Sequence, residues 1–150
     1  MRIWIDADSC PKRVRAIVER AANKRKIPCF FVANRKIPVG ISEYVKAIET
    51  ENTDQAADNY ICQNVKENDL VITRDIPLAK KLVDAKITTI NDRGTEFTSN
   101  DINTRLAERN FMYELASAGI APEKTHRLTK KDIQNFAANF DRILNARFKS

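Results

Sequence analysis

The chain has 150 residues, of which 43% are hydrophobic and 31% charged, and its formal net charge is +6. These values are typical of one globular domain, and no apolar run approaches the roughly 18 residues of a membrane-spanning helix. Three widely spaced cysteines exclude a disulfide framework, three scattered glycines exclude a glycine-rich phosphate loop, and the single histidine excludes two-histidine zinc chemistry. Because Asp6 interrupts any signal-peptide core, we expect a cytoplasmic protein without membrane partners.

Short apolar runs alternate with amphipathic helices through the first 95 residues. The apolar runs predict strands in five segments, at residues 2–5, 29–33, 44–48, 70–73 and 87–90. The first helix follows Pro11, and Asp8 or Ser9 is its expected cap. Further helices are predicted from Thr53 or Asp54 to about residue 65, and from Asp75 to residue 85. This alternation predicts a parallel sheet with helices on both faces.

Two more helices are predicted after the last strand. Thr98 or Ser99 caps a helix that ends at Gly119, and Thr129 with Asp132 resembles a capping box that begins the final helix. We therefore expect an α/β, three-layer parallel sheet wound with helices, followed by two additional C-terminal helices. The whole chain, 1–150, forms one domain in this interpretation, with an α/β core at 1–95 and a helical extension at 96–150.

Positive charge gathers in the first quarter of the chain. Nine Lys and Arg residues lie between Lys12 and Lys36, and only Glu19 opposes them. Such a patch favours a polyanionic partner, nucleic acid and above all RNA, although a solvated helix face explains a charge run equally well. Arg105 and Arg109, four residues apart on one helix face, can also reach phosphate. The candidate nucleic-acid-binding residues are Lys12, Arg13, Arg35, Lys36, Arg105 and Arg109.

Carboxylates follow several of the predicted strands. In open parallel sheets, ligands bind beyond the carboxyl ends of the strands. Asp6 and Asp8 follow the first strand, Asp75 follows the fourth, and Asp58 lies on the middle helix. We take these four as the candidate catalytic and metal-holding residues. Possible additional site residues are Asn34, Asp54, Thr73 and Asp92.

Gathering these acids at one edge of the sheet has an electrostatic cost. Two carboxylates about 5 Å apart repel by roughly 3 kcal/mol at an effective dielectric constant near 20. Protonation, neighbouring arginines or a divalent cation must compensate, and oxygen ligands favour Mg²⁺ or Mn²⁺. Such a metal beside a basic patch favours phosphodiester hydrolysis, because it polarises the phosphoryl oxygen and lowers the pKa of an attacking water.

Each candidate also has an ordinary structural explanation. Asp8, Asp54 and Asp75 are well placed to cap helices, and Asp92 and Asn34 are typical turn residues. Asp6 has the weakest such explanation, because a carboxylate at the end of a buried strand needs a partner.

Several motifs resemble those of the YaiI/YqxD family of uncharacterised bacterial proteins. The opening Trp4-Ile5-Asp6-Ala7-Asp8-Ser9-Cys10-Pro11 is similar to that family's D-A-D-x-C-P signature, and the segment 70–79 is similar to a second family motif. Weaker matches lie at 32–34, 56–58, 91–94, 103–112 and 129–136. The chain departs from the family pattern at Asp92 and Ile133, where the family has Pro and Arg.

The family in turn resembles the PIN-like nucleases. This resemblance implies acids clustered around one or two divalent metals, and cleavage of RNA or single-stranded nucleic acid. It implies that Asp6 is the first-strand acid, Asp58 the middle-helix acid and Asp75 the acid after the later strand. Asp8 is the family's own addition. Asp54 and Asp92 match further PIN acids more loosely, and a homodimer is plausible by the same resemblance.

Two alternatives to a nuclease stay open at this point. A phosphatase of the haloacid dehalogenase type would use Asp6 as nucleophile and Asp8 as acid/base, with later roles for Thr73 and Lys80. A non-catalytic RNA-binding regulatory module would keep the fold and the basic surface, and its affinity for RNA would not depend on Asp6.

Overall fold

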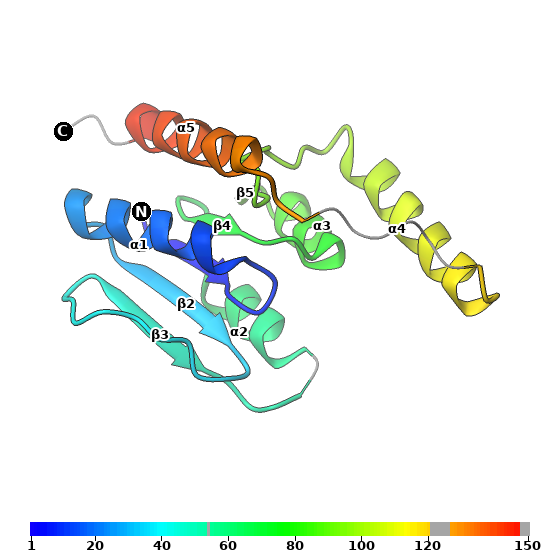
Figure 1. The fold of residues 1–150 in the computed structure, drawn as a ribbon, viewed down its shortest axis with the longest axis horizontal. Coiled ribbons are helices and arrows are strands. Elements are labelled where there is room, and N and C mark those ends of the chain that lie inside the picture. The colour runs from blue at the N-terminus through cyan, green and yellow to red at the C-terminus, as the bar shows by residue number, and fades with distance from the viewer. Residues whose placement is uncertain (54, 121–126, 148–150) are drawn as a thin grey trace.

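A computed structural model describes residues 1–53, 55–120 and 127–147. It contains one five-stranded sheet in which all strands are parallel, in the order β3-β2-β1-β4-β5 (Figure 1). The strands are β1 (Ile3–Asp6), β2 (Cys29–Ala33), β3 (Val45–Glu49), β4 (Leu70–Ile72) and β5 (Thr88–Ile90). The predicted α/β class is confirmed, and all five predicted strands are present.

Helices cover both faces of the sheet. They are α1 (Lys12–Arg25), α2 (Ala56–Asn64), α3 (Ile76–Asp84), α4 (Ile102–Ser117) and α5 (Lys130–Arg147). Because side chains alternate along a strand, Ile3 and Ile5 of β1 pack with α1 and α5, whereas Trp4 packs with α2 and α3. The result is a three-layer arrangement (Figure 1). None of the helices in the described parts of the chain is long and apolar enough to cross a membrane.

The helix starts correct one prediction and confirm another. Neither Asp8 nor Ser9 caps α1, because the chain makes a turn at residues 7–9 and the helix begins after Pro11 without a side-chain cap. The predicted cap was therefore wrong. At α5, Thr129 Oγ1 accepts a hydrogen bond from the Asp132 amide, and Asp132 Oδ2 accepts one from the Thr129 amide. That reciprocal pair is the predicted capping box.

The two C-terminal helices have different positions. Helix α5 lies beside α1 and buries Phe136, Phe140 and Leu144 against the same side of the sheet. Helix α4 packs against α3 through its first turn, where Ile102 is buried, and then extends beyond the sheet (Figure 1). Most residues of α4 are exposed, so the surface of this helix is available to a ligand at the carboxyl ends of the strands.

Candidate functional site

The last residue of β1 provides the most buried carboxylate of the site. Asp6 is only 4% exposed, and its Oδ2 accepts hydrogen bonds from Thr73 Oγ1 at 2.8 Å and Ser9 Oγ at 2.9 Å. Thr73 directly follows β4, the neighbour of β1, and is fully buried. The carboxyl ends of two adjacent strands therefore meet at Asp6, as the topology rule predicts.

Two more carboxylates join Asp6 from neighbouring elements. The Asp75 amide donates to Thr73 Oγ1 at 3.0 Å, and Asp75 Oδ1 accepts from the Leu78 amide at the start of α3. Asp75 is thus the helix cap that its position indicated. Asp58 of α2 lies close enough to Asp75 and Asp6 for both carboxylates to raise its pKa. We call Asp6, Asp58 and Asp75 the acid cluster.

Proton affinity is raised within the acid cluster. The pKa of Asp58 is raised to about 7, chiefly by burial and further by the Asp75 and Asp6 carboxylates. Lys81 of α3 partly offsets these effects. Burial also raises the pKa of Asp6, although the Thr73 and Ser9 hydroxyls oppose the increase. Near neutral pH, Asp58 therefore holds a proton for much of the time.

The donor chemistry of the acid cluster suits a hard cation. The atoms that it offers to a cation are all carboxylate oxygens. One of them, Asp6 Oδ1, receives no hydrogen bond from the described residues. Over 1–53, 55–120 and 127–147, however, no three His, Cys, Asp or Glu side chains are already arranged as a metal site. Carboxylate oxygens therefore lie near one another without the arrangement of a preformed metal site among the described residues.

Asp8 points toward the loop after β2 and is not part of the acid cluster. Its Oδ1 lies 3.3 Å from Arg35 Nε, and its Oδ2 accepts a hydrogen bond from the Asn34 amide at 2.9 Å. Its side chain is 30% exposed. Asp8 therefore lies at the rim of the site, where Arg35 neutralises part of its charge, and Asn34 contributes its backbone rather than its side chain to this contact.

The remaining candidate acids are placed elsewhere. Asp92 is buried between arginines, with Oδ2 at 3.2 Å from Arg74 Nε and Oδ1 at 3.9 Å from Arg93. Its Oδ2 still lacks a well-aligned hydrogen bond from the described residues. Two arginines thus compensate Asp92, which the structure does not join to the acid cluster. Asp54 lies outside the described residues.

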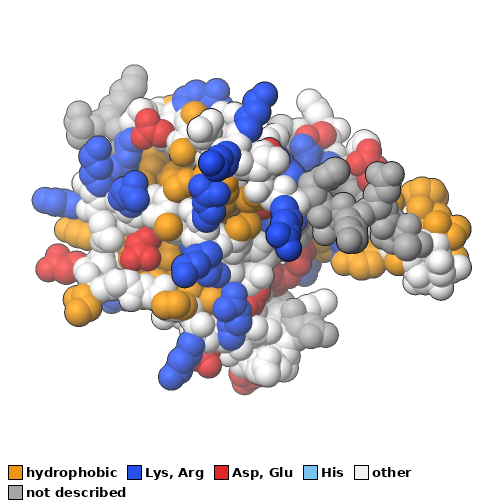
Figure 2. Space-filling view, viewed as in Figure 1, with side chains coloured by type: hydrophobic (Ala, Val, Ile, Leu, Met, Phe, Trp, Pro, Cys, Tyr) orange, Lys and Arg blue, Asp and Glu red, His pale blue; other side chains and the backbone are white. Residues whose placement is uncertain are grey.

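The predicted phosphate-binding residues divide into free and engaged side chains. Lys12, Arg13 and Lys36 are exposed, and Arg35 pairs with Asp8 while remaining 55% exposed. Arg105 is engaged, since it pairs with Asp101 at 3.2 Å and lies over the Phe97 ring. Figure 2 shows Lys and Arg side chains spread over the face that carries α1.

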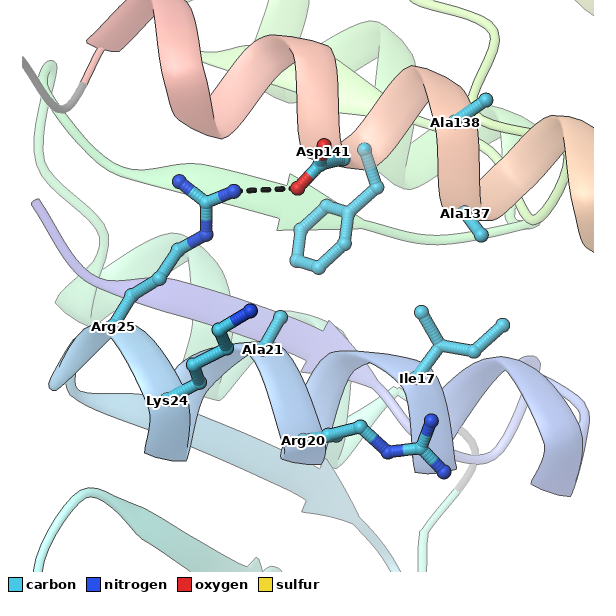
Figure 3. Close-up of a pocket in the computed structure, with 9 residues that line it drawn as sticks. Ile17, Arg20, Ala21, Lys24, Arg25, Ala137, Ala138 and Asp141 are labelled. Carbon is cyan, nitrogen blue, oxygen red and sulfur yellow. Dashed lines mark hydrogen bonds and ion pairs between the residues drawn. The ribbon is translucent and has the colours of Figure 1, made fainter.

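Part of this positive charge borders a separate groove between α1 and α5. The groove has a volume of about 400 Å³ and an apolar floor that includes Ile17 and Phe140. Arg20 and Lys24 line it from α1, and Arg25 pairs with Asp141 of α5 at 2.5 Å (Figure 3). It contains no residue of the acid cluster, so part of the basic surface lies apart from the candidate site.

Sequence reasoning missed three residues that shape the site. Ser9 was weighed only as a helix cap, yet its hydroxyl binds Asp6 and accepts from the Arg74 amide. Lys81 was not considered, although it lies near Asp58. Tyr113 follows Arg109 by four residues, and this spacing is the one signal that could have paired them.

The raised pKa of Asp58 leads to a prediction about pH and stability. In the unfolded chain an Asp titrates near 3.9, so between about pH 4 and 7 the folded protein binds more protons, and stability falls as pH rises. Without metal, Asp58→Asn should unfold as wild type does at pH 4.5. At pH 8 it should be more stable by about 1 kcal/mol, after allowance for solvent screening of this half-exposed group.

Urea denaturation in EDTA at the two pH values measures the difference. Asp84→Asn, at an exposed position paired with Lys80, is the matched control and should change stability little at either pH. Equal stability of wild type and Asp58→Asn at pH 8 would contradict the crowding of the three carboxylates.

Comparison with known proteins places this geometry in a family. A family model described as "Uncharacterized BCR, YaiI/YqxD family" matches residues 4–146. A "UPF0178 protein" of Treponema denticola is 56% identical over 144 residues, which cover 96% of this chain and 92% of that protein. Those of Treponema pallidum and Psychromonas ingrahamii are 49% and 44% identical, covering 95% and 96% of this chain and 80% and 95% of their own lengths. No solved structure matches. The chain therefore belongs to the YaiI/YqxD family.

Proposed function

We propose that the protein is a divalent-metal-dependent nuclease that hydrolyses phosphodiester bonds in RNA or single-stranded nucleic acid. The observation that carries this proposal is the convergence of Asp6, Asp58 and Asp75 at the carboxyl ends of β1 and β4. Buried carboxylates whose pKa values are raised, that of Asp58 to about 7, indicate a functional site when they gather at the ends of two neighbouring strands. The resemblance to PIN-like nucleases supports the same reaction.

Mg²⁺ or Mn²⁺ is the proposed cofactor. Asp6, Asp58 and Asp75 would hold it, with Asp8 at the rim. When bound, the ion supplies Lewis-acid polarisation of a phosphoryl oxygen and makes a water nucleophile available near neutral pH. The protein's own part is to orient Asp6 through the Thr73 and Ser9 hydroxyls, and to release the proton held by Asp58. Cofactor binding should therefore strengthen as the pH rises through 7.

Exposed cations supply the phosphate-binding surface in this proposal. Lys12 and Arg13 open α1 directly after the turn that carries Asp8. Arg109 borders the same turn from α4. These residues compensate the charge of the substrate while the acid cluster carries the reaction, so binding and cleavage should be separable by mutation.

The phosphatase alternative has less support. Lys80 lies on α3 with its ammonium group 3.0 Å from Asp84, whereas that chemistry needs this lysine beside the Asp6 nucleophile. An RNA-binding module without activity would explain the exposed cations, but it gives no reason for three crowded carboxylates whose repulsion opposes folding.

Cleavage of labelled oligonucleotides by the purified protein tests the proposal. We expect shortened products from 5′-labelled single-stranded RNA in millimolar Mn²⁺ or Mg²⁺, and none in EDTA. Acid-quenched reactions with a phosphomonoester should trap no aspartyl-phosphate, and a trapped Asp6 adduct would favour the phosphatase instead. If the protein binds RNA or single-stranded DNA without metal and cleaves neither, it is a binding module and the nuclease proposal is contradicted.

A further inference from the structure

Helix α4 forms one wall of a hollow beside the acid cluster. The hollow has a volume of about 460 Å³, within the range of small-ligand sites. Asp8 and Asp75 line one side, and Arg109 and Tyr113 of α4 line another. Asp75 belongs both to the hollow and to the acid cluster. A group bound against α4 would therefore lie next to the proposed reaction centre.

Tyr113 is an unusual residue to find at this wall. Its side chain is 58% exposed, although aromatic rings of this size usually contribute to a core. The Arg109 guanidinium lies over one face of the Tyr113 ring, 4.2 Å from its centre, so the two side chains form a cation–π stack at this wall. The first turn of α4, anchored by buried Ile102 against α3, holds this surface in place.

The chemistry of this pair matches a nucleotide. Nucleobases stack on exposed tyrosine rings and on arginine guanidinium planes, and arginine also binds phosphate. Arg105, one turn earlier, pairs with Asp101 and lies over Phe97, which anchors it outside α4. Arg109 contacts Asn110 and Tyr113, both on its own exposed helix, so it can change partner without breaking a contact between elements. A base stacked here must lie outside the interior of a duplex, because an interior base has both faces covered by its neighbours.

We propose that Tyr113 and Arg109 hold the nucleotide that flanks the scissile phosphate, and that they make the site selective for single-stranded nucleic acid. This inference rests on the proposed function, because the acid cluster defines which phosphate is scissile. Tyr113 stacks on the base, and Arg109 contacts its phosphate. Both are positioning residues, since neither belongs to the acid cluster.

Binding measured in EDTA tests this inference without any cleavage. The probe is a short single-stranded RNA that contains 2-aminopurine, whose fluorescence falls when the base stacks. We expect Tyr113→Ala to weaken binding by about 5- to 100-fold and to remove the fluorescence change. Tyr113→Phe keeps the ring and should bind within about twofold of wild type.

Phe111→Ala is the matched control. Phe111 lies on the same helix and is 57% exposed, but it does not line the hollow, so its loss should leave binding unchanged. Equal weakening by Phe111→Ala and Tyr113→Ala, together with a change in oligomeric state, would overturn the inference and assign α4 to contact with a second copy of the chain. Unchanged binding by Tyr113→Ala, or equal affinity for a duplex of the same sequence, would also overturn it.

The inference and the proposed function can fail separately. Stacking that depends on Tyr113, without cleavage in any metal, would support nucleotide binding by α4 and contradict the nuclease. Metal-dependent cleavage by both wild type and Tyr113→Ala, with equal affinity for single-stranded RNA, would support the nuclease and overturn the role of Tyr113.

Discussion

Asp6→Asn should lower metal-dependent cleavage by at least about 1,000-fold, the largest effect on activity that we expect from one substitution. Asp6 is the one member of the acid cluster held by two hydroxyls, Thr73 and Ser9, and it is almost fully buried. Asn keeps the shape of the side chain and removes its charge. Because the variant retains the exposed cations of α1, its affinity for RNA in EDTA should stay within a few-fold of wild type.

Thermal unfolding shows whether the same substitution removes the metal. For wild type, Mn²⁺ at a hundredfold its dissociation constant should add about 2.7 kcal/mol of stability. For a chain of this length that is roughly 5–10 °C in Tm. Asp6→Asn should show no such shift, and in EDTA it should unfold at or above the wild-type temperature because one source of repulsion is gone.

Two further variants make this test specific to the acid cluster. Asp8→Asn changes a carboxylate that is close in sequence but paired with Arg35, so its loss of activity should be much smaller than that of Asp6→Asn. Asp84→Asn, on the exposed face of α3, should behave as wild type. Cleavage by Asp6→Asn at the wild-type rate, or equal losses in all three variants, would refute the assignment of the site.

The fold could be predicted because burial dominates the strands. Ile3–Asp6 and Leu70–Ile72 are buried on both faces of the sheet, so they read as continuous apolar runs in the sequence. Helix starts were harder. The turn at residues 7–9 offers Asp8 and Ser9 as caps, and only the three-dimensional path shows that their oxygens bind Asn34 and Asp6 instead.

The site was predictable where the rule of parallel strands applies, and less so elsewhere. That rule places Asp6, Thr73 and Asp75 together because β1 and β4 are neighbours. The same rule does not separate Asp75 from Asp92, because the two residues follow adjacent strands, β4 and β5. The difference comes from Arg74, whose side chain pairs with Asp92, and such long-range pairing has no signal in local sequence.

At the opposite ends of the strands, a carboxylate that the sequence did not single out has the largest expected effect on stability. Asp69 precedes β4, is 3% exposed and accepts four hydrogen bonds. They come from the Arg2 amide and guanidinium, the Trp4 indole and the Lys66 amide, at 2.9–3.0 Å. Asp69→Ala leaves the buried Trp4 indole and the three partly buried donors without this acceptor and should cost about 3–5 kcal/mol, against less than about 1 kcal/mol for exposed Asp84→Ala.

The pH dependence distinguishes this role from simple packing. Burial by itself raises the pKa of Asp69, but the hydrogen bonds from Trp4, Lys66 and Arg2 outweigh burial, so the net pKa is lowered. Because the folded pKa of Asp69 lies below the unfolded value of about 3.9, the ionised carboxylate stabilises the protein fully above that pH. This stabilisation is lost as the pH falls through the folded pKa. In urea denaturation, the difference between wild type and Asp69→Ala should be constant from pH 8 to 5 and shrink below pH 4. Two results would contradict this role: a difference under about 1 kcal/mol at pH 7, or a difference that grows as the pH falls. Either would show that the charged form of the Asp69 carboxylate does not hold β1 to β4.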